Sequence, residues 1–209
     1  MFPPFYAIID PALTPVPIVQ LAGSLAATGV ELIQLRDKHG SPRAIYYQAK
    51  EIAAFFDKAS VRFIINDRPD IAAICGAGGV HVGQDDLPVE AARAICAKPL
   101  WVGVSTHNLA QLRDADRTSA DYIAVGPVFP TGTKANPDPV VGLEFIRAAR
   151  QATRKPLVAI GGITVESAAD VLRAGADSVA VIRDLLAAPD PAGRAREYLE
   201  VAHSIRRFE

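Results

Sequence analysis

Long apolar runs are missing from this 209-residue chain, and so is an excess of charge of either sign. No stretch reaches about 18 uninterrupted apolar residues, so no segment is expected to span a membrane. The start of the chain lacks the basic and apolar regions of a signal peptide, which predicts a cytoplasmic location. Lys and Arg number 22 against 23 Asp and Glu, which argues against a nucleic acid or membrane surface as partner.

Cysteine is scarce, with only Cys75 and Cys96 in the whole chain. Both fall in segments with a helical pattern, and their spacing is not that of metal ligands. The pair makes no disulfide framework, so we expect two reduced thiols in the core. Any anion-binding site must then be built locally, from a few cations and backbone amides.

Short segments rich in β-branched residues are abundant, and segments with helical periodicity separate them. Eight such alternations favour parallel strands joined by crossover helices. The number predicts one (β/α)8 TIM barrel over residues 1–209, with no linker that divides the chain. An open doubly wound sheet also alternates strands and helices, but the first strand has no G-x-G-x-x-G after it. The expected strands are Phe5–Asp10, Val30–Arg36, Arg62–Asp67, Gly79–Gly83, Trp101–Thr106, Tyr122–Val128, Leu157–Gly162 and Ser178–Arg183.

Helix starts and one long loop complete the expected architecture. Ser41 and Pro42 open a helix, and Thr164 to Ser167 lead another, which Gly175 closes. The turn-rich segment Pro130–Gly142 follows the sixth strand at the catalytic end of such a barrel. Loops of this length without their own secondary structure tend to be functional, so we interpret it as a lid.

The run from Gln34 to Lys38 ends the second expected strand and carries the strongest local signal. Because side chains alternate in a strand, Gln34, Arg36 and Lys38 share one face, while Leu35 takes the other. A strand that frays into a solvated turn would look similar. Gln34 and Arg36 continue the inward face of Leu32, however, and burying them without a polar ligand is costly. A binding site is therefore favoured.

Carboxylates follow the third and fourth expected strands, at Asp67 and at Asp85 or Asp86. Mg²⁺ takes a couple of carboxylates together with water and phosphate oxygens, which suits a metal–diphosphate complex. Helix capping is the competing interpretation, with Asp67 near Pro69 and Asp86 near Pro88. The nearby cations of the same rim favour the metal.

Further polar groups lie at the remaining strand ends. The run Thr131, Gly132, Thr133 and Lys134 offers hydroxyls and a cation, although surface turns often have this composition. His107 could transfer a proton or only cap and pack, and His81 is expected to be structural. Gly161 and Gly162 fit a backbone phosphate site after strands seven and eight, and equally tight strand–helix packing.

Taken in order, these motifs resemble the thiamine phosphate synthase family over nearly the whole chain. The resemblance rests on Gln34–Lys38, Ile65–Asp67, Gly79–Asp86, Gly103–Ser105, Gly126–Lys134 and Ile160–Ile163. It implies small-molecule substrates, namely aminomethylpyrimidine diphosphate and a plain or carboxylated thiazole monophosphate. It also implies one Mg²⁺ per active site and a dissociative substitution through a pyrimidine-methyl cation, helped mainly by electrostatic stabilisation and positioning.

The resemblance assigns roles residue by residue. Asp67 and Asp86 would bind Mg²⁺, and Arg36, Lys38, Ser105 and Lys134 would be catalytic. The expected substrate-binding residues are Gln34, Leu35, Arg36, Asp37, Lys38, Asn66, Ser105, Thr131, Gly132, Thr133, Lys134, Gly162, Ile182 and Arg183. The family commonly has Ser where this chain has Arg183, so the resemblance does not decide whether residue 183 contacts the thiazole phosphate.

Two other functions remain as alternatives. Thiazole tautomerases share the barrel and a His at the position of His107, but they resemble the diphosphate and metal motifs less. A non-catalytic barrel that binds thiazole phosphate and regulates a partner would not need both metal carboxylates. The sequence leaves open whether the chain forms a homo-oligomer.

Overall fold

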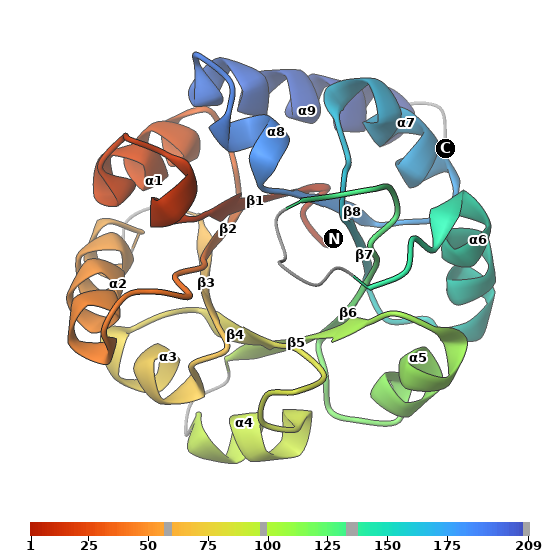
Figure 1. Cartoon of the computed structure of the whole chain (residues 1–209), viewed down its shortest axis with the longest axis horizontal. Coiled ribbons are helices and arrows are strands. Elements are labelled where there is room, and N and C mark those ends of the chain that lie inside the picture. Colours follow the sequence, from red (N-terminus) through yellow and green to blue (C-terminus); the bar gives the residue numbers. More distant parts are fainter. Residues whose placement is uncertain (57–59, 97–99, 133–137, 207–209) are drawn as a thin grey trace.

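The computed structural model describes residues 1–56, 60–96, 100–132 and 138–206. Eight parallel strands within these residues close into a barrel in chain order, with β8 paired to β1. Looking down the molecule, Figure 1 shows the strands as an inner ring surrounded by helices. The predicted (β/α)8 barrel is confirmed. The strands are β1 Phe5–Ile9, β2 Leu32–Leu35, β3 Arg62–Asn66, β4 Gly79–Val82, β5 Trp101–Thr106, β6 Tyr122–Val125, β7 Leu157–Ile160 and β8 Ser178–Val181.

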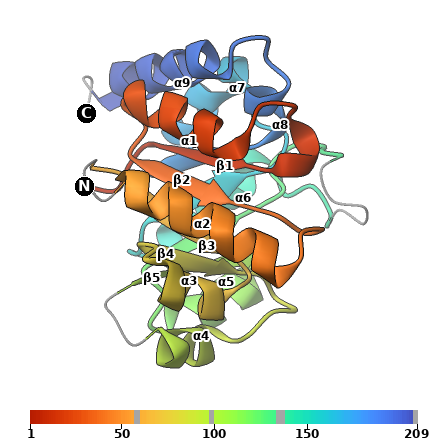
Figure 2. The same cartoon turned by 90° about the vertical axis from the view of Figure 1, so that its left-hand side faces the viewer.

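The helices follow the strands along the chain and cover the outside of the barrel, as the side view in Figure 2 also shows. A 3-10 turn, Pro11–Leu13, follows β1. The helices are α1 Ile18–Ala27, α2 Pro42–Phe56, α3 Pro69–Cys75, α4 Val89–Ile95, α5 Leu109–Asp116, α6 Gly142–Ala152, α7 Val165–Arg173, the short α8 Arg183–Leu186, and α9 Pro191–Arg206. No helix in the described ranges is long and apolar enough to cross a membrane.

The predicted helix starts are confirmed by hydrogen bonds. The Ala44 amide donates to Ser41 Oγ at the start of α2, 3.2 Å away, and the Thr164 amide donates to Ser167 Oγ at the start of α7, 3.0 Å away. Gly175 follows α7 with a φ of +114°, a conformation that favours glycine. Cys75 and Cys96 are both free and buried, as expected.

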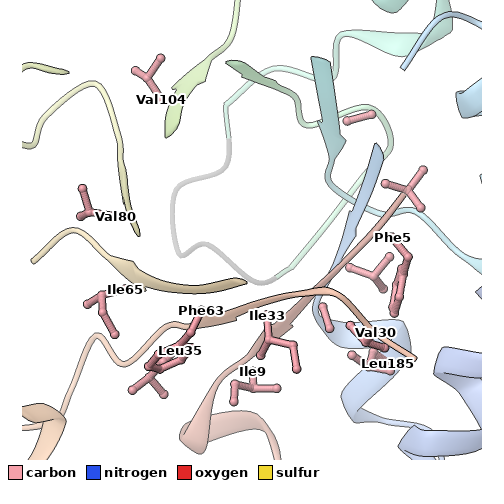
Figure 3. Packing of buried hydrophobic residues seen from close by; sticks show 14 of the residues in the cluster. Phe5, Ile9, Val30, Ile33, Leu35, Phe63, Ile65, Val80, Val104 and Leu185 are labelled. Carbon is pink, nitrogen blue, oxygen red and sulfur yellow. The ribbon is translucent and has the colours of Figure 1, made fainter. Parts of the chain in front are cut away.

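Alternation of side chains along each strand produces two separate hydrophobic cores. Outward-facing residues such as Phe5, Ile33 and Ile65 pack between the strands and the helices, and Figure 3 shows this outer core from close by. Inward-facing residues fill the barrel itself: Tyr6, Ile8, Leu32, Ile64, Tyr122, Ala124, Val158 and Ala180. The barrel is therefore a packed interior rather than a channel.

Aromatic residues close the barrel at the amino ends of its strands. The Phe2 ring stacks on Trp101, with 5.3 Å between centroids, and also packs on Tyr122. The Arg62 guanidinium lies over the Trp101 ring, 3.8 Å from its centroid, and makes a cation–π contact. Ligands must therefore enter from the opposite end, where the strands finish.

Candidate active site

A pocket of about 640 Å³ occupies the barrel mouth at the carboxyl ends of the strands. Residues at the carboxyl ends of β2 to β8 line it, because parallel strands all end at the same rim. The predicted residues that line it are Arg36, Lys38, Asn66, Asp67, Ser105, Thr131, Gly132, Gly162, Ile182 and Arg183. The structure thus brings together most of the site expected from the sequence.

Two cations reach one side of the pocket, and each already pairs with a carboxylate. An Arg36 guanidinium nitrogen donates to Asp10 Oδ2, and Asp10 is almost fully buried at the end of β1. Lys38 Nζ donates to Asp67 Oδ2 at the more exposed rim. Both pairs fix the direction of the cation, so its remaining donors can face an anion in the pocket.

Asp67 has a left-handed backbone conformation and does not cap a helix. Its φ is +60°, which is uncommon for a residue with a side chain, and its amide donates to the His81 carbonyl oxygen 2.7 Å away. The first residue before α3 is Arg68, and no side chain caps that helix. The capping alternative is therefore wrong for Asp67.

Asp86 lies beside Asp67 and is also no helix cap. One of its oxygens accepts the Gly83 amide, 2.7 Å away, within the turn after β4, while α4 starts at Val89 and its N-cap residue, Pro88, has no side-chain cap. Burial raises the pKa of the Asp67 carboxyl, and the Asp86 carboxyl raises it further against the opposing effect of Lys38. Two neighbouring carboxylates of this kind suit a hard divalent cation, which would relieve their repulsion.

A polar group of buried side chains forms the floor of the pocket. Tyr6, Gln34 and Tyr122 hydrogen-bond within the barrel, and His81 links them to Ser105 at the surface of the pocket. Burial lowers the pKa of His81 to about 4, against a weaker opposing effect of Asp86, so the imidazole is neutral at pH 7. The expectation that His81 is structural misses that it lines the pocket.

Glycine backbone and arginines form the opposite side of the pocket. Gly162 has a φ of +63°, and an added Cβ would approach the Pro130 carbonyl oxygen to 2.5 Å, so only glycine fits. Arg183 donates to the Gly132 carbonyl oxygen, 2.9 Å away, and so joins the β8 end to the loop after β6. Arg194 of α9 also lines this side, 3.8 Å from an Asp184 oxygen.

His107 holds the other end of the same loop. Its Nδ1 lies 2.6 Å from the Gly126 carbonyl oxygen, and its Nε2 lies 3.4 Å from an Asp138 oxygen. The Nδ1 atom must carry a proton to make the first contact, because a carbonyl oxygen only accepts. Both contacts bridge β5 to the segment around β6, and both His107 and Asp138 line the pocket.

Some predicted residues lie elsewhere. Leu35 packs in the outer core, and Asp37 accepts the amides of His39 and Gly40 in a turn, while Gln34 lies below the pocket surface. Thr133 and Lys134 fall outside the described residues.

The sequence interpretation missed several groups that the fold brings to the site. Asp10, Tyr6 and Tyr122 were not singled out, and neither were Asp138 and Arg194. The inward face of each strand, counted back from its polar end, is a signal that would have identified Asp10, Tyr6 and Tyr122. Nothing local in the sequence marks Arg194, which reaches the pocket from the last helix.

The chain is similar to known proteins over most of its length. The chain is 49% identical over 207 residues to a thiamine-phosphate synthase of Koribacter versatilis, covering 97% of both chains. It is 43% identical to one of Methanospirillum hungatei, covering 94% of this chain and 96% of that one. A solved thiamine phosphate pyrophosphorylase from Pyrococcus furiosus superposes with a TM-score of 0.88 at 31% identity, over 97% of this chain and 96% of that one. The family model described as thiamine monophosphate synthase matches residues 5–185, so the chain belongs to that family.

Proposed function

We propose that this protein is a thiamine-phosphate synthase, which joins a pyrimidine diphosphate to a thiazole monophosphate and releases pyrophosphate. One observation carries the proposal above the others. The pocket has Arg36, Lys38 and Asp67 on one side, with Asp86 next to Asp67, and a glycine backbone with arginines on the other. Such a pocket suits one substrate that brings a metal-bound diphosphate and another that brings a monophosphate.

The diphosphate belongs on the side of Arg36, Lys38, Asp67 and Asp86. Mg²⁺ bound by the two carboxylates would neutralise charge on the diphosphate as it departs, with one ion per site. Arg36 offers planar donors that match phosphate oxygens, and Asp10 holds it in place. Lys38 is poised between Asp67 and the pocket, so it can shift from the carboxylate to a diphosphate oxygen.

The monophosphate belongs on the side of Gly162 and Arg183. Backbone amides near Gly162 can approach a phosphate closely because no side chain intervenes. The Arg183 guanidinium makes one described contact, to the Gly132 carbonyl oxygen, and this uses one of its five donors. We infer that its other donors face the thiazole phosphate, which Ser at this position could not reproduce.

The proposed reaction exchanges one bond for another at the pyrimidine methylene carbon. The carbon–oxygen bond to diphosphate breaks, and the diphosphate leaves with the electron pair. The thiazole nitrogen then donates its lone pair to the same carbon, and a carboxylated thiazole would also lose carbon dioxide. No nucleophile from the protein is required, so Arg36, Lys38 and Ser105 act by positioning and by stabilising charge.

The decisive experiment measures pyrophosphate release with both substrates and Mg²⁺. A synthase releases pyrophosphate only when both substrates are present and produces thiamine phosphate in equal amount. A thiazole tautomerase would convert the thiazole substrate without pyrophosphate, and a non-catalytic regulator would bind it without turnover. Either result would refute the proposal.

A further inference from the structure

We propose that His81 is a positioning residue, whose Nε2–H is directed at Ser105 by a one-way chain of hydrogen bonds that begins at Gln34. The chain makes Ser105 a hydrogen-bond donor toward the pocket. The inference rests on the proposed function only in its last step, where Ser105 meets the pyrimidine diphosphate. The direction of the chain is a property of the protein alone.

Five side chains make the chain, and each contact has ordinary hydrogen-bond length. Gln34 Nε2 donates to the Tyr6 hydroxyl at 2.6 Å, and the two phenol oxygens of Tyr6 and Tyr122 are 3.0 Å apart. The Tyr122 hydroxyl lies 3.0 Å from His81 Nδ1, and His81 Nε2 lies 2.9 Å from Ser105 Oγ. The chain crosses the barrel interior from β2 to β5.

The direction follows from counting protons, because a phenol has one to donate. Tyr6 accepts from Gln34, and among the described residues the Tyr122 oxygen is the acceptor that the Tyr6 proton reaches, so Tyr6 donates to Tyr122. Tyr122 must then give its proton to His81 Nδ1, which leaves the imidazole proton on Nε2. Ser105 therefore accepts from His81.

The surroundings keep this order intact. Gln34 is 2% exposed and His81 8%, so water has little access to break the sequence of donors. Burial raises the pKa of both Tyr6 and Tyr122, so both phenols keep their protons. Glycine at 103 is required for this arrangement, since a Cβ there would lie 2.0 Å from the Tyr122 ring.

The consequence appears at Ser105, the member of the chain that lines the pocket beside His81. Because Ser105 Oγ accepts from His81, its own hydroxyl proton is available to an acceptor in the pocket. In the reverse order, Ser105 would donate to Nε2 and would offer the pocket only lone pairs. The direction thus selects a substrate that presents a hydrogen-bond acceptor at this point, as a pyrimidine diphosphate does.

Nitrogen-15 NMR of the histidine rings tests the direction without any substrate. The His81→Gln variant identifies the His81 signals by their loss. The wild-type protein should show the Nε2–H form of His81, and a proton found on Nδ1 instead would overturn the proposal. Ser105→Ala is the matched control, because it removes the end of the chain and should leave the Nε2–H form in place.

A second variant reverses the chain. Gln34→Glu, studied at a pH where its carboxyl is ionised, places only acceptors at the start of the chain, so Tyr6 would donate to the carboxylate and each later bond would reverse. We expect the His81 proton to move to Nδ1. A folded Gln34→Glu protein that keeps the proton on Nε2 would overturn the one-way chain. If this variant does not fold, the wild-type spectrum still decides the direction.

A double-mutant cycle tests whether His81 acts through Ser105. His81→Phe keeps an aromatic ring beside Tyr122 and removes the hydrogen bond, so kcat should fall roughly tenfold with little change in the KM for the thiazole substrate. In the Ser105→Ala background the same change should have almost no further effect. Independent, multiplicative losses would refute the positioning role. Failure of the proposed function is distinct, because the wild-type protein would then release no pyrophosphate.

Discussion

Protonation of His81 should make the protein lose stability as the pH falls below neutrality. The imidazole is 8% exposed, and burial lowers its pKa to about 4 from an ordinary value of 6.5. Between these two pH values the unfolded chain binds a proton that the folded protein does not. The free energy of unfolding therefore rises with pH through this window and falls as the pH is lowered from 6.5 to 4.

The size of the effect follows from the two pKa values. A difference of about 2.5 pH units corresponds to about 3 kcal/mol, which is a large fraction of the stability of a typical domain. Carboxylates elsewhere in the chain titrate in the same range, so the wild-type curve alone does not isolate His81. The difference between wild type and His81→Gln cancels those contributions.

Urea unfolding at half-unit steps from pH 7 to pH 4, with a chelator present, measures this difference. His81→Gln should lose less stability across the window than wild type, by about 3 kcal/mol. Ser105→Ala keeps the buried imidazole and should follow the wild-type slope. Parallel curves for wild type and His81→Gln would refute the reasoning, because they would show that His81 titrates alike in both states.

Three further predictions concern the rim of the pocket. Mg²⁺ should raise the melting temperature of the wild type but not of Asp67→Asn, and this shift should weaken in acid as the Asp67 carboxyl gains its proton. Calorimetry with and without Mg²⁺ measures the shift. An equal shift in both proteins would contradict the metal site. Arg183→Ser should raise the KM for the thiazole phosphate roughly tenfold, or more, and leave that for the pyrimidine diphosphate unchanged, as steady-state kinetics would show. An unchanged KM would leave the guanidinium only its contact to Gly132. Asp10→Ala should cost about 2–4 kcal/mol in urea unfolding, because it leaves Arg36 without its buried partner, and an unaltered midpoint would contradict that pairing.

The strands are predictable from the sequence because their apolar pattern is strong, but most of the predicted strands extend beyond the observed carboxyl end. The expected strand Tyr122–Val128 ends at Val125, and Ser178–Arg183 ends at Val181. At the rim the backbone leaves the barrel to reach the next helix, as at Arg183, which is already the first residue of α8. Trp101–Thr106 was predicted with its observed ends.

The candidate site was predictable where polar residues cluster in sequence and not where the barrel assembles them. Arg36, Lys38 and Asp67 were identified from their strand ends, and all line the pocket. The burial of Asp10 against Arg36 joins the ends of the neighbouring strands β1 and β2, which no local pattern reveals. Helix capping and metal binding use the same residue types, so the sequence could not distinguish them. The backbone conformation of Asp67 in the structure excludes the helix cap.

The aromatic closure at the amino ends of the strands determines where substrates enter the barrel and products leave it. With Phe2, Trp101 and Arg62 sealing that end of the described barrel, the mouth is the route for two substrates coming in and two products going out. If the rim cations bind the diphosphate as proposed, pyrophosphate that remains there occupies the site of the next pyrimidine diphosphate. On that assignment we expect added pyrophosphate to inhibit the next turnover in competition with the pyrimidine diphosphate.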